Sequence, residues 1–221
     1  MSTVAHEHGA LRENVVAALR QDIVSGRLAP GEPLRTEVVM QRFGVSNSPL
    51  REAFAQLASE GLVVVQRNRG AMVAPLSRRD AADVFRVSGL LMEHVLRWAL
   101  PRLVPGDVAT LRRISLDFDL AYRSGDLVTA FAESDRYGEV LLERCGSVEL
   151  ARAFQALLPR LQRLVRLLDP VEYLALQGSL QSAVLASAED ADVESAVTAV
   201  TSIWRQVERA VEALGDDTIG S

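Results

Sequence analysis

The sequence predicts a mostly α protein, with an N-terminal winged helix-turn-helix followed by a C-terminal six-helix antiparallel bundle. Two short helical stretches with a tight turn between them precede two strand-like runs within residues 34–73. Six amphipathic segments of helix length, joined by short connections, fill residues 77–214. Ten arginines oppose seven acidic residues up to Arg79, whereas fourteen oppose twenty-two after it. This asymmetry fits a phosphate-binding module joined to an acidic one.

The first elements follow from apolar spacing and from turn residues. Residues 1–9 are expected to be disordered, and a first helix is expected over about 10–25, with its apolar side chains on one face. The segment GRLAPGEPL is predicted to be a turn because it holds two prolines and two glycines. A second helix over about 37–43 would have Thr36 at its N-cap, and Gly44 would end it in a left-handed conformation.

A third helix and a hairpin complete the N-terminal module. The helix is expected over about 47–60, with Ser46 at its N-cap and apolar residues on the inward face. Two short strands over 62–66 and 71–75 would flank the tip RNRG, which would form the wing. The module is therefore expected to span residues 10–76.

The remaining sequence is predicted to be helical. The expected helices cover about 77–100, 106–123, 126–145, 148–168, 171–188 and 190–214. They would form a second domain over 77–214, followed by a tail over 215–221.

The chain has a single cysteine, Cys145, which forbids an internal disulfide and fits the reducing cytoplasm. The chain has no apolar run of roughly 18 residues and no signal-peptide core, so no membrane partner is expected.

Polar side chains gather where a recognition helix would meet double-stranded DNA. Asn47 and Arg51 are four residues apart and project from one helix face, where they could bond adenine and guanine edges. Backbone N–H groups at the start of the second helix favour a phosphate. The residues expected at DNA are Arg35, Thr36, Ser46, Asn47, Ser48, Arg51, Arg67, Asn68, Arg69 and Gly70. The alternative is an ordinary three-helix unit whose polar groups are simply solvated. That alternative does not explain why a turn, an outward polar face and a wing follow one another in this order.

The stretch FGVSNSPLREAFAQLASEGLV resembles the signature of the GntR family of bacterial transcription regulators. The helical part resembles the FCD domain of the FadR subfamily, with a local match at YGEVLLERCGS. The resemblance implies a homodimeric regulator, most often a repressor, that binds a short palindromic operator and senses an effector in its C-terminal domain. Arg51 falls on the family's second recognition arginine and Gly70 on its wing glycine. The family usually has arginine where this chain has Asn47, so a different base preference is expected.

Many FCD domains hold a divalent metal with one aspartate and three histidines. The resemblance places these ligands at Ser134, Gly138, Gln181 and Ile203 of this chain. None of the four residues can act as the usual ligand, and neither glycine nor isoleucine has a side-chain donor. We therefore expect no metal and no other cofactor.

The same positions suggest a site for an organic molecule. Ser134 and Gly138 share a helix face with apolar residues, so they are expected to point inward. A glycine in place of a histidine would leave space. The sequence predicts a metal-free cavity for a small organic effector, a carboxylate or an acyl compound, lined by Ser134, Tyr137, Gly138, Gln181 and Ile203. The alternative is that apolar neighbours fill this space and no effector exists.

Other side chains of the bundle fit structural roles better than functional ones. His94 is expected to be a half-buried structural residue, and Trp98 and Trp204 are expected in the core. Arginines at 160, 163 and 166 could anchor a carboxylate, but a solvated helix face is the preferred interpretation.

Three other functions compete with an effector-released repressor. A regulator controlled by a protein partner or by its abundance would need no ligand. A metal-free regulator could respond to acyl-CoA. An enzyme on a helical bundle would need a catalytic set, but the sequence has no paired inward carboxylates and no Ser-His-Asp arrangement.

Overall fold

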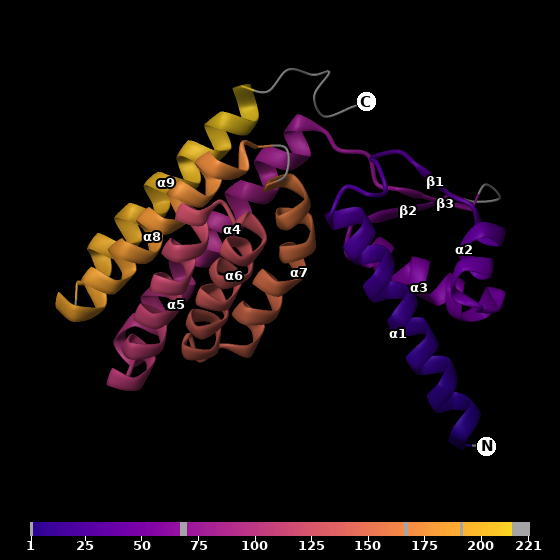
Figure 1. Cartoon of the computed structure of the whole chain (residues 1–221), viewed down its shortest axis with the longest axis horizontal. Helices are drawn as coiled ribbons and strands as arrows, with labels where there is room; N and C mark the ends of the chain where they lie inside the picture. The colour runs from indigo at the N-terminus through magenta and orange to yellow at the C-terminus, as the bar shows by residue number, and fades with distance from the viewer. Residues whose placement is uncertain (1, 67–69, 166–167, 191, 214–221) are drawn as a thin grey trace. The chain divides into compact units, whose positions relative to one another are not determined.

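The computed structural model describes residues 2–66, 70–165, 168–190 and 192–213 (Figure 1). The N-terminal elements are α1 (Ser2–Val24), β1 (Pro33–Leu34), α2 (Thr36–Phe43), α3 (Asn47–Ser59), β2 (Val63–Gln66) and β3 (Gly70–Val73). The later elements are α4 (Arg78–Ala99), the 3-10 turn η1 (Leu100–Arg102), α5 (Pro105–Ser124), α6 (Leu127–Arg144), α7 (Val148–Val165), α8 (Pro170–Asp190) and α9 (Val193–Ala213). This is the predicted mostly α architecture.

The elements form two compact units, each with its own core. The first unit contains Met1–Arg78 and Leu157–Leu167, and the second contains Arg79–Ala156 and Leu168–Leu214. No described helix is long and apolar enough to cross a bilayer.

The core of the first unit lies between α1, α3 and a three-stranded antiparallel sheet of order β1-β3-β2. Helix α1 contributes buried side chains one turn apart because its apolar residues recur with helical spacing. The helix residues at the centre of this core are Val15, Leu19, Ile23, Leu50, Ala53, Phe54 and Leu57. The exposed side of α3 is thereby left for polar residues.

Strand β1 was not predicted, because the sequence indicates only a turn there. Pro33 pairs with Met72 and Leu34 pairs with Ala71 of β3. Val73 N also donates to Glu32 O at 2.9 Å. This strand depends on pairing with residues far along the chain, which the local turn signal does not reveal.

Helix starts differ from the predicted ones at two places. Helix α1 begins at Ser2 in the structure, whereas the sequence predicted disorder over 1–9 and a helix start near 10. Once a helix has formed, each added residue gains a hydrogen bond, so it can extend into permissive sequence. Helix α2 starts at Thr36 and has Arg35 at its N-cap, which moves the predicted cap by one residue.

The second unit is a helical bundle in which α5 packs on α6 and α8, and α8 packs on α9. Figure 1 shows α8 and α9 side by side. Ion pairs reinforce the packing, because Arg86 and Arg97 of α4 bond Glu208 and Glu194 of α9. The predicted helices match α4 to α9 within a few residues at each end.

Three bundle predictions need correction. Trp98 is 41% exposed, whereas Trp204 is buried as expected. His94 is exposed, and its Nδ1 lies 2.9 Å from Leu90 O. Arg163 is buried and donates to Ala74 O, with both residues in the first unit, so the predicted solvated face is wrong there. Burial lowers the pKa of Arg163 to about 10.

Candidate functional site

The recognition face is the exposed side of α3. Leu50, Ala53 and Leu57 are fully buried in the core of the first unit. Asn47, Ser48 and Arg51 are exposed on the opposite side, in the first turns of the helix. The 3.6-residue period of a helix separates these two sets. A row of polar side chains therefore lies at the N-terminal end of α3.

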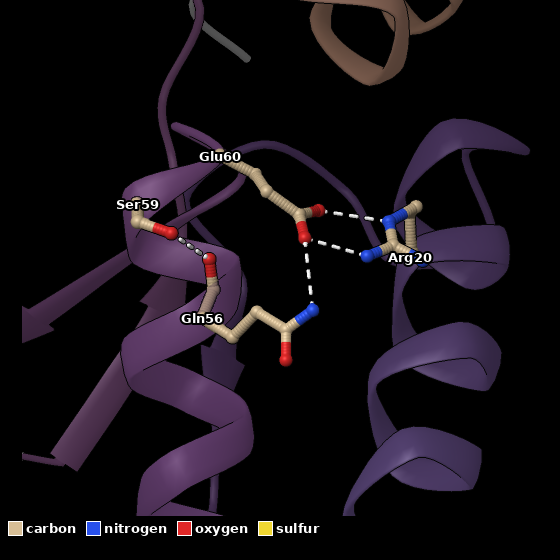
Figure 2. Close-up of polar contacts among 4 residues, drawn as sticks. All are labelled: Arg20, Gln56, Ser59 and Glu60. Carbon is tan, nitrogen blue, oxygen red and sulfur yellow. Dashed lines mark hydrogen bonds and ion pairs between the residues drawn. The ribbon is translucent and has the colours of Figure 1, made fainter. Parts of the chain in front are cut away.

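Helix α3 is fixed to α1 by a bidentate ion pair (Figure 2). Arg20 donates from Nε to Glu60 Oε2 at 2.8 Å and from Nη2 to Glu60 Oε1 at 2.5 Å. The hydrogen bond to Glu60 raises the pKa of Arg20. Gln56 Nε2 also donates to Glu60 Oε1 at 3.5 Å, and Ser59 Oγ donates to Gln56 O at 2.7 Å. These contacts hold the C-terminal end of α3, opposite the polar row.

Helix α2 is fixed to α1 by the buried carboxylate of Asp22. Arg27 donates to Asp22 Oδ1 at 2.6 Å, and Arg42 of α2 lies 2.7 Å from Asp22 Oδ2. Burial alone would raise the pKa of Asp22, but the hydrogen bonds from Arg42 and Arg27 outweigh it and keep that pKa below its ordinary value. The carboxylate therefore stays charged and sets the position of α2.

The turn between α2 and α3 follows from Gly44. Its backbone is left-handed, with φ 63° and ψ 30°, and its N–H donates to Met40 O. Glycine adopts this conformation without steric conflict, as the sequence predicted. Val45 N also donates to Met40 O at 3.2 Å. The chain thus reverses tightly and starts α3 beside α2.

Both helix starts present backbone N–H groups that no side chain caps. Arg35 is the N-cap of α2 and is exposed, and Thr36 after it is half-buried. Ser46 is the exposed N-cap of α3, as predicted, with φ −81° and ψ 175°. Neither N-cap side chain accepts a hydrogen bond from its helix. Uncapped N–H groups at helix starts favour anions such as phosphate.

Only the end of the predicted wing lies within the described residues. Gly70 is exposed at the start of β3 and has a left-handed backbone with φ +82°. Arg67, Asn68 and Arg69 lie outside the described residues.

The predicted bundle site joins α6 to α8 through polar groups. Tyr137 is buried, and its hydroxyl donates to Gln181 O at 3.1 Å. Burial raises the pKa of Tyr137, so the hydroxyl remains a neutral donor. One turn before Tyr137, Ser134 Oγ lies 3.4 Å from Gln177 Oε1. Gln177 was not predicted, although its spacing of four residues from Gln181 places both on one face of α8.

The inward face of α6 is rotated from the predicted one. Ala130, Tyr137 and Leu141 are fully buried, whereas Ser134 and Gly138 are half-buried at the margin. The reason is that the large Tyr137 ring takes the central place facing α8. Ile203, the fifth predicted residue, is buried on α9. A Cβ built on Gly138 would meet no atom within 4 Å, so this margin holds open space.

Two family models match the two parts of the chain. Residues 11–73 match the bacterial regulatory proteins of the gntR family, and residues 83–213 match the FCD domain. The chain belongs to the GntR family.

Individual relatives of this GntR protein agree with that assignment. The uncharacterized HTH-type transcriptional regulator BphR of Paraburkholderia xenovorans (strain LB400) is 31% identical over 167 residues, covering 72% of this chain and 67% of BphR. The HTH-type transcriptional repressor GlaR of Escherichia coli (strain K12) is 39% identical over 84 residues, covering 38% of each chain. The protein is thus similar to transcriptional regulators, not to enzymes.

A solved structure supports the fold of this GntR protein. The solved structure of E. coli McbR/YncC aligns with a TM-score of 0.72 at 22% identity, covering 91% of this chain and 97% of the other. At this identity the likeness concerns the fold alone. The family models and the curated relatives identify a DNA-binding transcriptional regulator with an FCD domain.

The metal common in FCD domains does not fit the residues present here. The corresponding positions hold a hydroxyl at Ser134, no side chain at Gly138, a carboxamide at Gln181 and an alkyl group at Ile203. Within the described ranges, no three His, Cys, Asp or Glu residues are grouped to hold a metal ion. Divalent transition metals prefer imidazole, thiolate and carboxylate ligands, so this donor set is unsuitable.

Proposed function

We propose that this GntR regulator represses transcription as a homodimer that binds a short palindromic operator and leaves it when an organic effector binds the FCD domain. The observation that carries the proposal is the exposed polar row of Asn47, Ser48 and Arg51 on the helix whose other face packs in the core. The name of GlaR, a repressor that is 39% identical over 84 residues, supports repression.

The proposed DNA contacts divide by chemistry. Arg51 would read a guanine through its O6 and N7, and Asn47 would read an adenine through its N6 and N7. Ser48 would bond a neighbouring base edge. Arg35, Thr36 and Ser46 surround the uncapped starts of α2 and α3, which suit phosphate oxygens. Phosphate contacts would fix the register, and base contacts would give the sequence preference.

The wing completes the proposed interface. Arg67, Asn68 and Arg69 would approach a phosphate or the minor groove beside the half-site, since they lie in the sequence between β2 and β3. The left-handed backbone of Gly70 supports a sharp turn there.

A palindrome requires two copies of the reader. One α3 fits one major groove, and two half-sites about one helical turn apart need two chains related by a twofold axis. The FCD domain would hold the two winged helices at that spacing. The proposed homodimer therefore couples the bundle to the DNA.

The effector would act by preferring one spacing of the two winged helices. It can shift that equilibrium only by as much as its affinities for the two arrangements differ. The open space at Gly138 and the buried carboxamide of Gln181 support a ligand site between α6 and α8. A regulator without a ligand would keep its operator affinity under every metabolite tested.

Selection of bound duplexes from a random pool tests the proposal. We expect the wild-type protein to enrich a palindrome. Arg51→Ala should enrich no motif, or one with relaxed half-sites, because it loses a bidentate base contact. Arg209→Ala removes the same charge from an exposed position of α9 and should select the wild-type motif. Wild-type protein with no preference among duplexes would refute the proposed function.

A further inference from the structure

The interior of the bundle contains polar atoms that lack hydrogen-bond partners. Among the described residues, Ser88 Oγ on α4, Trp204 Nε1 on α9, and both Gln181 Nε2 and Gln181 Oε1 on α8 are buried without a partner. Gln181 is 1% exposed. Native proteins seldom leave a buried carboxamide without any bond, because its desolvation is then uncompensated. A bound ligand or a water molecule could satisfy Gln181.

Open space lies on α6 at the residue after the one that contacts Gln181. The Tyr137 hydroxyl holds this turn of α6 against Gln181 O, at 3.1 Å. The next residue is Gly138, where a side chain would meet no atom within 4 Å. An unpartnered buried amide on α8 and an open position on α6 therefore occur on the two helices that this contact joins.

The charges of the bundle interior limit what can bind there. The buried polar and charged side chains described in this unit are Ser88, Asp107, Gln181 and Ser187. Asp107 is already paired, since it accepts from Val104 N at 2.9 Å and from Arg144 at 2.8 Å. Arg163 of α7, within the residues that match the FCD domain, is buried and already donates to Ala74 O. Among the described residues, no other buried cation and no group of metal ligands is available to compensate the charge of a buried carboxylate ligand.

We infer that the FCD domain of this protein binds an uncharged ligand bearing a carboxamide or lactam group, recognised by Gln181 without a metal. Gln181 Nε2 donates to the ligand carbonyl, and Gln181 Oε1 accepts from the ligand N–H. The inference rests on the proposed function, in which this site holds the effector. It separates this chain from FCD domains that bind their ligand through a metal.

A pair of matched variants tests the state of Gln181 in the free protein. Gln181→Leu removes both unpartnered atoms at similar volume and should raise the melting temperature by about 3–6 °C. Gln177→Leu makes the same change one turn earlier, where the amide is half-buried and within 3.4 Å of Ser134 Oγ, and should give no increase. An unchanged or lower melting temperature in Gln181→Leu would overturn the inference.

Binding is tested on the full-length protein with matched probes. We expect benzamide or hexanamide to raise the wild-type melting temperature, and benzoate and hexanoate to raise it less or not at all. Gln181→Leu should lose the amide shift, and Gln177→Leu should keep it. Gly138→Leu fills the open position and should also lose the shift, which tests that position independently of Gln181. Zn²⁺ and Ni²⁺ should cause no shift.

Several outcomes would overturn the inference. They are a larger shift with the carboxylates, stoichiometric metal binding, and the absence of any Gln181-dependent shift with the amides. The last outcome would mean that water satisfies the amide. Melting uses no DNA, so a failure here is distinct from a failure of the proposed function, which would appear as a lack of operator preference.

Discussion

Asn47 and Arg51 lie one helical turn apart on the exposed face of α3. The sequence was sufficient to predict this placement, because Gly44 marks the turn and the apolar residues of α3 recur with helical spacing. Sequence could not show that Gln181 is buried without partners, because that depends on how α6 and α8 pack. Gln177 was missed although its spacing of four residues from Gln181 places both on one face of α8.

The side chain at position 47 is expected to determine one base of each half-site. Asn47→Arg should move the preference at that base from adenine toward guanine, because arginine matches guanine O6 and N7. A good bidentate contact is worth about 1–3 kcal/mol, so a change of roughly 5- to 150-fold is expected. Selection of bound duplexes with both proteins measures it. An identical motif from the two proteins would mean that position 47 reads no base.

Asp22 is expected to make the winged helix sensitive to acid. Its pKa is lowered in the folded protein, so its stabilising effect is complete above the ordinary value of 3.8 and is lost as the pH falls through the lower folded pKa. Asp22→Asn should destabilise the protein at pH 6 by about 2 kcal/mol and flatten the pH dependence below pH 4.

Thermal melting between pH 6 and pH 2.5 checks this prediction. Asp83→Asn is the control, because Asp83 is an exposed carboxylate of α4 and should leave both values close to those of the wild type. An acid dependence that Asp22→Asn shares with the wild type would contradict the role given to Asp22.

At the scale of the elements, local patterns predicted the helices well and the sheet poorly. Helices α4 to α9 were found because each buries an apolar stripe of helical period. Strand β1 was missed because its hydrogen bonds go to β3, about 40 residues away. The predictions for Trp98 and Arg163 were wrong because the spacing of apolar residues along a helix does not show which side of the apolar face is covered by another element.

The link between α1 and α3 is expected to stabilise the reading module. Glu60→Ala removes both bonds to Arg20, a pair whose side chains are 32% and 17% exposed. We expect a loss of about 1–2 kcal/mol in urea unfolding, because bidentate charge-assisted bonds are stronger than ordinary surface pairs. Ser59→Ala breaks only an exposed local bond and should change stability little. Equal effects of the two variants would show that the ion pair contributes nothing.

At the scale of the whole molecule, the account requires two chains on one operator. Native mass spectrometry should find two chains per selected duplex. Insertion of about five base pairs at the dyad should lower affinity at least tenfold, because it places the half-sites on opposite sides of the helix. A ten-base-pair insertion is the control for added length, because it returns the two half-sites to the same side of the DNA helix. One chain per duplex with full affinity would contradict the homodimer.

The central claim is that Arg51 contacts a guanine edge in the major groove, and one measurement addresses that contact directly. The selected operator is made with 7-deazaguanine at a single position, which removes the N7 acceptor, and binding by wild-type protein and Arg51→Ala is compared. The account predicts one guanine per half-site whose replacement weakens the wild type severalfold and leaves Arg51→Ala unchanged. Equal losses for both proteins at every guanine would contradict it.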